Sequence, residues 1–253
     1  MIDKYIEKSN LNDFSSGGTN KRCFIFDEYV LLKSNNYYGK YGNTDEKFAR
    51  DKEKQRTIMK ELKENGVNIP LLLEYKRVGS FDYELQERAE GEELYTSNMD
   101  RSVEGQKKYL KRLKDIAMQP IEFYDKFIYD WNMILKLGLC IDPSKCSNFF
   151  YHNGKISFID LNVMKDGISS LEKAMEDMYY EMACVLCGGG LLYMCKLVSN
   201  ESSKLIEIIY KKLGEAIVRA NGDVSEYVAS VDPTNEYGLS EYINNVVKKN
   251  RYQ

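Results

Sequence analysis

The sequence predicts an α+β protein of two lobes, and the distribution of apolar residues along the chain leads to this prediction. Short apolar segments separated by tight turns occupy much of residues 1–90. Longer amphipathic segments of helical period occupy much of residues 91–253. Because the strand-like and helix-like segments are segregated instead of alternating, they indicate an α+β architecture. We therefore expect an N-lobe over 1–90 and a helical C-lobe over 91–253.

The N-lobe is expected to contain a five-stranded sheet and one helix. Strands within residues 12–33 surround a turn at Gly17 and Gly18, and residues 68–94 form two more strands around Gly79. Between these strands, a stretch of helical period begins after a polar loop. The order is therefore three strands, one helix and two strands.

The helix of the N-lobe is expected to begin at about Thr44, a residue suited to capping a first turn, and to end at Gly66. Five of its residues recur at helical spacing and share one face, which predicts the buried side. These residues are Phe48, Gln55, Ile58, Met59 and Leu62.

The C-lobe is expected to contain four main helices. They fall at about 105–119, 121–138, 170–188 and 202–220. Gly138 is a typical C-terminal stop for the second of them. The apolar stripe of that helix consists of Phe123, Phe127, Trp131 and Ile134.

The composition is typical of a globular protein without a strong electrostatic preference. Of its 253 residues, 43% are hydrophobic and 30% are charged, which excludes disordered and collagen-like classes. The net charge of −3 gives the whole molecule no footprint for nucleic acid, so no such partner is expected. No apolar run reaches the roughly 18 residues of a membrane span, and the start lacks a signal-peptide pattern. Six cysteines in mostly apolar settings indicate reduced thiols and favour the cytoplasm.

One hairpin combines apolar strands with three short polar side chains. Residues 140–162 read CIDPSKCSNFFYHNGKISFIDLN, in which Asp142, Asn148 and Asp160 surround the apolar segments. A carboxylate that follows four largely apolar residues, as Asp160 does, needs a partner. The hairpin is therefore predicted to carry a functional site.

The order of these residues resembles that of the protein kinase-like superfamily. Phosphoryl transfer needs a lysine for the phosphates, an amide and a carboxylate for Mg²⁺, and a second carboxylate for the accepting hydroxyl. YVLLK, which ends at Lys33, looks like the V-A-I-K strand. Asp142 and Asn148 look like the catalytic loop, and IDLN, which contains Asp160, looks like D-F-G. The resemblance implies a bilobal kinase-like fold with ATP and Mg²⁺ as cofactors, Asn148 and Asp160 being the metal ligands.

Two further segments fit the same resemblance. Gly17 and Gly18 lie where kinases carry a glycine-rich loop over the phosphates, although SSGGTNKR is a reduced form that does not match G-x-G-x-x-G. LQERAEGEEL resembles the hinge between kinase lobes. By this match Gln86 is the gatekeeper, and the backbone of Glu87 and Ala89 faces the adenine.

The catalytic loop departs from the family pattern in two ways. Cys140 stands where kinases carry a histidine that braces the backbone. Asp142 and Asn148 are six steps apart instead of five, so Pro143 occupies the expected aspartate position. We interpret Pro143 as part of a bulge that still lets Asp142 reach the acceptor. Catalysis depends on where the carboxylate lies in space more than on its exact spacing from Asn148 in the sequence. Lys145 corresponds to a lysine that contacts the transferring phosphate in Ser/Thr protein kinases.

The helix and the activation segment also depart from the pattern. Glu53 is the nearest glutamate to pair with Lys33, whereas Gln55 lies on the apolar face and would turn the ion pair into a hydrogen bond. Only 17 residues separate Asp160 from Asp177, which corresponds to a structural aspartate of the large lobe. Such a short segment indicates a minimal type of kinase, similar to small bacterial effector kinases and to aminoglycoside phosphotransferase-like kinases.

Three functions are consistent with these features. The first is an atypical minimal Ser/Thr kinase that transfers the γ-phosphate of ATP to a protein hydroxyl. The second is a small-molecule kinase with the same fold, and the third is a pseudokinase that binds a partner or a nucleotide without catalysis. A protein substrate or a small hydroxyl acceptor is the expected partner, and an effector would act after delivery into a host cell.

Overall fold

The structure is a computed structural model, and it describes residues 1–9, 16–17, 21–35, 44–95, 102–142, 146–163, 178–188 and 200–221. Three elements of the sequence analysis lie outside these residues. They are Gly18, the loop residues Pro143 and Lys145, and the segment 164–177 that follows the hairpin.

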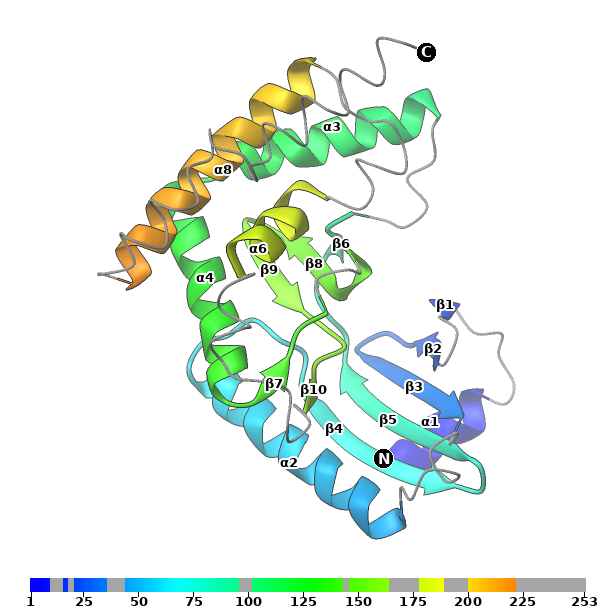
Figure 1. Cartoon of the computed structure of the whole chain (residues 1–253). Helices are drawn as coiled ribbons and strands as arrows, with labels where there is room; N and C mark the ends of the chain where they lie inside the picture. The colour runs from blue at the N-terminus through cyan, green and yellow to red at the C-terminus, as the bar shows by residue number, and fades with distance from the viewer. Residues whose placement is uncertain are drawn as a thin grey trace.

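The first part of the chain forms one antiparallel sheet (Figure 1). The five strands are arranged in the order β1-β2-β3-β5-β4, which confirms the predicted five-stranded sheet. Their bounds are Ser16–Gly17 for β1, Lys21–Ile25 for β2, Tyr29–Asn35 for β3, Leu72–Val78 for β4 and Phe81–Glu87 for β5.

A helix that the sequence analysis does not predict, α1 (Ile2–Ser9), covers one face of this sheet. Its Ile2 packs with Leu31 of β3 and with Tyr83 and Leu85 of β5 in a small apolar cluster. The backbone N–H of Ile2 also donates a hydrogen bond to Glu74 at 2.7 Å. A helix of eight residues has little stability by itself, so these tertiary contacts hold it.

The helix of the N-lobe, α2 (Asp45–Glu64), covers the opposite face of the sheet. Thr44 caps it as predicted, because its side chain accepts a hydrogen bond from the backbone of Lys47 at 3.2 Å. The buried residues are Phe48, Gln55, Ile58, Met59 and Leu62, which confirms the predicted face. Because successive side chains of a strand alternate between faces, each strand residue lies either on the face that α1 covers or on the face that α2 covers.

The second part of the chain is mostly helical. Its long helices are α3 (Val103–Ala117), α4 (Ile121–Lys136) and α8 (Asn200–Asn221), with the shorter α6 (Met178–Cys187) beside them. Helix α8 packs against the other three (Figure 1). Among the helices of the described residues, none has the length and apolar character needed to cross a bilayer.

The predicted hairpin lies between the sheet and the helices (Figure 1). It consists of β8 (Phe149–His152) and β9 (Lys155–Phe158), and β6 (Glu92–Glu93) pairs with β8. A short 3-10 turn, η2 (Cys146–Asn148), precedes β8. The base of the hairpin is closed by a second pair of short strands, β7 (Leu139–Cys140) and β10 (Asn162–Val163).

An aromatic cluster fixes the hairpin on α4. The ring of Trp131 stacks on Phe149 with centroids 6.2 Å apart, and Phe127 stacks on Phe158 at 5.6 Å. All four side chains are buried. The apolar stripe predicted for α4 therefore serves as the platform for the strands that end at the polar residues of the hairpin.

We expect Gly91→Ala to destabilise the fold more than Gly79→Ala. Both glycines have positive φ, +88° and +61°, so an alanine costs about 1–2 kcal/mol at either position. At Gly91 a Cβ would also lie 2.3 Å from the carbonyl oxygen of Tyr151, whereas at Gly79 it meets no atom within 4 Å. This overlap should add about 1–3 kcal/mol to the loss of unfolding free energy in Gly91→Ala, which denaturant unfolding measures. Equal losses in the two variants would contradict the close approach of Gly91 to β8.

Candidate functional site

Asp160 lies where β9 leaves the hairpin, in an unusual backbone conformation. Its φ is +54°, one of two positive values among the non-glycine residues of the described chain. Its carboxylate pairs with the ammonium of Lys21 at 2.6 Å, and its carbonyl accepts a hydrogen bond from the side chain of Asn162 at 2.9 Å. Non-glycine residues with positive φ are enriched at functional sites. The side chains of Lys21 and Asp160 are both about 30% exposed, so a ligand can reach them.

Asn148 lies next to Asp160 through the backbone. The N–H of Ile159 donates to the carbonyl of Asn148 at 2.9 Å. The side chain of Asn148 is buried, and its amide nitrogen donates to the carbonyl of Asp142 at 3.3 Å. The predicted residues Asp142, Asn148 and Asp160 are therefore brought together at one end of the hairpin.

Cys140 braces the same region. It lies opposite Asn162 in the pairing of β7 with β10, and its thiol donates a hydrogen bond to the carbonyl of Asn162 at 3.3 Å. Burial raises the pKa of the Cys140 thiol, and the nearby carboxylates of Asp142 and Asp160 raise it further. The thiol thus stays protonated and can act as a donor where the resemblance implied a histidine.

Lys33 does not join these residues. Its ammonium lies over the ring of Phe81 at 4.3 Å and near the ring of Tyr83 at 5.5 Å. Tyr83 belongs to the apolar cluster under α1, so Lys33 lies on the face of the sheet away from α2. The lysine that reaches Asp160 is Lys21 of β2, which the sequence analysis missed.

Glu53 also points away from the cluster. Its carboxylate accepts hydrogen bonds from Arg56 at 2.8 Å and from Tyr75 at 3.3 Å on the outside of α2. Gln55 is the inward residue, and its side chain donates to the carbonyl of Leu161 at 2.5 Å. Of the two residues considered for the helix, the structure therefore brings Gln55, not Glu53, to the loop that carries Asp160.

The carboxylate at the centre of the sheet face is Glu84 of β5. It pairs with Lys52 of α2 at 2.9 Å, and Lys52 also donates to Gln55 at 2.9 Å. Burial alone would raise the pKa of Glu84, but the charges of Lys52 and Lys21 outweigh it and lower the pKa to about 2. Glu84 is therefore ionised at neutral pH; it pairs with Lys52 and also lies within the field of Lys21, which itself pairs with Asp160.

The predicted hinge follows directly on β5. The backbone N–H of Glu87 bonds to the carbonyl of Leu71 and that of Arg88 to the carbonyl of Glu28, both at 2.9 Å. Within the described chain no group hydrogen-bonds the half-buried backbone N–H of Ala89. Gln86 is buried beside Glu84, to which its amide donates at 3.3 Å. Ala89 thus offers a backbone donor at the end of the strand, whereas the N–H of Glu87 is already used.

The glycine turn is only partly described. Gly17 lies opposite Arg22 in the pairing of β1 with β2, so it is on the strand beside the one that carries Lys21. Gly18 lies outside the described residues. The paired strands β1 and β2 therefore carry Gly17 and Lys21 close together in the sheet.

The donor set at the hairpin is suited to Mg²⁺ held jointly with phosphates. Asp160 supplies a carboxylate and Asn148 an amide oxygen, both of which are ligands that Mg²⁺ accepts. Mg²⁺ usually takes one or two carboxylates and completes its shell with substrate phosphates and water. Among the described residues, no group of three or more His, Cys, Asp and Glu side chains is placed to hold a metal ion.

Comparison with protein families and with curated proteins finds no match. Comparison with solved structures finds WbdD, whose crystal structure with the kinase inhibitor LY294002 has 13% identity and a TM-score of 0.40 over 79% of this chain. It also finds the kinase domain of PF14_0431, with 14% identity and a TM-score of 0.40 over 68% of this chain. This chain spans 45% and 61% of the length of those two chains. A third structure is described as that of the bifunctional kinase-methyltransferase WbdD, with 15% identity and a TM-score of 0.37.

Loss of the Glu84 carboxylate should change how stability depends on pH. The pKa of Glu84 in the folded protein lies below the ordinary value of 4.5. Its ionised carboxylate therefore stabilises the fold fully above pH 4.5, and this stabilisation is lost as the pH falls toward 2. Glu84→Gln should be less stable than the wild type by about 3 kcal/mol at neutral pH, since Lys52 loses its buried partner. Between about pH 5 and pH 3 the variant should lose less stability than the wild type.

The matched control for this prediction is Glu207→Gln, because Glu207 is an exposed glutamate of α8. Denaturant unfolding at several pH values should give the control the same acid dependence as the wild type. If Glu84→Gln showed that same dependence, the low pKa of Glu84 would be wrong.

Proposed function

We propose that the protein is an ATP- and Mg²⁺-dependent phosphotransferase of the protein kinase-like type. The observation that carries the proposal is the ion pair between Lys21 of the sheet and Asp160 of the hairpin, next to the buried Asn148. A lysine in contact with a carboxylate, with an amide side chain close by, supplies groups that phosphoryl transfer from a nucleotide requires. The kinases among the solved structures agree with this class, but the proposal depends on the side chains of this chain.

The adenine is proposed to lie at the end of β5. The backbone N–H of Ala89 is available as a donor there, and the carbonyl of Glu87 is the acceptor that the resemblance implies. The phosphates would extend toward Gly17, Gly18 and Lys21. In this proposal Lys21 takes the role first assigned to Lys33, because it lies on the face of the sheet that points to Asp160.

Glu84 steadies the proposed phosphate lysine. In the kinase pattern a glutamate of the helix pairs with the lysine, but here the helix supplies Lys52 and Gln55 and the sheet supplies the carboxylate. Glu84 stays ionised beside both lysines, so it keeps a negative charge close to Lys21 when Asp160 turns to a metal. Glu53, which is tied to Arg56 on the outside of α2, has no part in this arrangement.

The chemistry follows from the roles of the hairpin residues. Mg²⁺, when bound with the nucleotide, would neutralise charge on the phosphates, and Asp160 and Asn148 would hold it. Asp142, tied to Asn148 through its carbonyl, would orient the accepting hydroxyl and receive its proton. Cys140 would keep Asn162, and with it the turn at Asp160, in place.

A protein hydroxyl is the proposed acceptor. The support is the correspondence of Lys145 with the lysine of Ser/Thr protein kinases, a residue that contacts the transferring phosphate. The alternatives of a small-molecule acceptor and of a pseudokinase have the same nucleotide-binding groups. They differ from the first proposal in the product of the reaction, so an assay of phosphate transfer separates them.

Replacement of Asp160 by Asn should lower phosphate transfer by at least about 100-fold, because the carboxylate that holds the metal is lost. Replacement of Asp142 by Ala should do the same through the acceptor. The assay follows label from Mg·ATP into the protein itself and into generic protein substrates, and circular dichroism checks the fold. A wild type that binds Mg·ATP but transfers no phosphate to protein, amine or sugar acceptors would favour a pseudokinase. Full activity of Asp160→Asn would disprove the assignment.

Lys21→Met should weaken Mg·ATP binding and reduce transfer by about 100-fold, whereas Lys33→Met should stay within about twofold of the wild type. The two variants are matched, because each removes one ammonium group from one of the neighbouring strands β2 and β3 and keeps the length of the side chain. Affinity is measured by calorimetric titration with Mg·ATP and transfer by label incorporation. The reverse order of effects would return the role of phosphate lysine to Lys33.

A further inference from the structure

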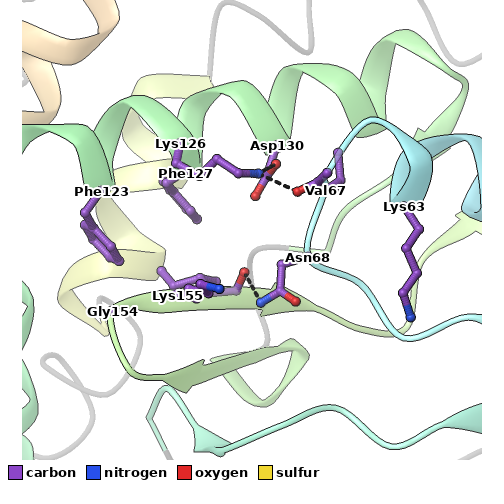
Figure 2. A pocket seen from close by; sticks show the side chains of 11 residues that line it. Lys63, Val67, Asn68, Phe123, Lys126, Phe127, Asp130, Gly154 and Lys155 are labelled. Atoms are coloured by element: carbon purple, nitrogen blue, oxygen red, sulfur yellow. Dashed lines mark hydrogen bonds and ion pairs between the residues drawn. The ribbon is translucent and has the colours of Figure 1, made fainter.

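A pocket lies between the end of α2, α4 and the turn of the hairpin (Figure 2). Its volume is about 250 Å³. The residues that line it include none of the groups assigned to the nucleotide, the metal or the acceptor. They are Lys63, Gly66, Val67, Asn68, Phe123, Lys126, Phe127, Asp130, Gly154, Lys155 and Ile156.

The inner wall of this pocket is apolar. Val67, Phe127 and Ile156 are all buried, and the ring of Phe127 stacks on Phe158. Asn68 closes the wall by donating from its side chain to the carbonyl of Ile156 at 3.2 Å and to the hydroxyl of Ser157 at 2.7 Å. A preformed apolar wall with a few fixed polar groups is typical of a small-molecule site.

The rim of the pocket carries three ammonium groups and one carboxylate. Figure 2 shows Lys126 and Asp130 on α4, with Asn68 and Lys155 across the pocket from them. Lys126 is paired with Asp130 and also donates to the carbonyl of Gly66 at 2.9 Å. Lys63 is paired with Glu87 outside the pocket. Two of the three positive charges are therefore compensated by carboxylates.

Lys155 is the charge that remains. It is exposed at the start of β9, and it makes no ion pair with any residue of the described chain. Asp130 is buried, and burial raises its pKa to about 6 against the opposing effect of Lys126. It is therefore mostly ionised at neutral pH and balances Lys126. The pocket as a whole has one uncompensated positive charge beside an apolar wall.

We propose that this pocket binds a small organic carboxylate, a monoanion whose apolar group lies against Phe127, Val67 and Ile156 and whose charge is met by Lys155. The single uncompensated charge favours a carboxylate over a doubly charged phosphate monoester, because a second negative charge would lack a partner. The apolar wall distinguishes such a ligand from an inorganic anion, which would gain nothing from it. The site is separate from the proposed nucleotide site and does not depend on phosphotransfer.

The test uses the intact chain without nucleotide and titrates it with phenylacetate. The only tryptophan, Trp131, lies against Phe127 with ring centroids 5.6 Å apart, so its emission reports on the pocket wall. Saturation-transfer NMR on the phenylacetate signals gives a second readout. We expect saturable changes in both, and about tenfold weaker binding of 2-phenylethanol, which has the same ring without the charge.

The variants locate the binding. Lys155→Gln should weaken phenylacetate binding by about tenfold, while Lys155→Arg should retain it, because the charge and not the lysine itself is required. Lys108→Gln is the matched control, since Lys108 is an exposed lysine of α3 outside the pocket, and it should bind like the wild type.

Three results would overturn the proposal. The first is an absence of any emission change and of any saturation transfer with phenylacetate in the wild type. The second is equal binding by Lys155→Gln and Lys108→Gln, which would place phenylacetate elsewhere. The third is tighter binding of phenyl phosphate than of phenylacetate, which would show that the ligand of the pocket is a phosphate monoester and not a carboxylate. None of them bears on the transfer assay, so each proposal can fail by itself.

Discussion

The ion pair between Glu84 of β5 and Lys52 of α2 is the interaction on which the arrangement of the candidate site depends. A carboxylate in the middle of a sheet face has a large desolvation cost unless a cation meets it. Lys52 meets this need at 2.9 Å and fixes the rotation of α2 over the sheet. That rotation turns Gln55 toward the carbonyl of Leu161, so the helix also holds the loop next to Asp160. One buried charge thereby connects the sheet, the helix and the hairpin.

Under the proposed function, the departures from the kinase pattern compensate one another. Where the pattern has a lysine on the third strand and a glutamate on the helix, this chain has a lysine on β2, a glutamate on β5 and a lysine and a glutamine on α2. The signs of the charges are exchanged between the elements, but a lysine and a carboxylate still meet on the same face. Cys140 similarly supplies from its thiol a hydrogen bond to the backbone at Asn162. If the proposal holds, these exchanges would keep a lysine beside Asp160 although the sequence motifs do not match closely.

Some parts of the fold could be predicted from the sequence because they depend on local periodicity. The buried face of α2 and its cap at Thr44 follow from the 3.6-residue period and from one side chain. Helix α4 similarly follows from its stripe of Phe123, Phe127, Trp131 and Ile134. Helix α1 could not be predicted in this way, because eight residues are too few for periodicity, and its position is set by Ile2 and Glu74.

The sequence by itself determined the five strands of the first sheet and the long helices, and it placed Asp142, Asn148 and Asp160 around one hairpin, because these three residues are close along the chain. It could not determine which lysine meets Asp160. In YVLLK both faces of the strand carry apolar residues, so the pattern does not say which face Lys33 takes. Only the tertiary structure decided that Lys33 lies over Phe81 and that Lys21, 139 residues from Asp160, reaches the carboxylate. Such a contact depends on how the sheet pairs and on how it sits against the hairpin, which local spacing does not record.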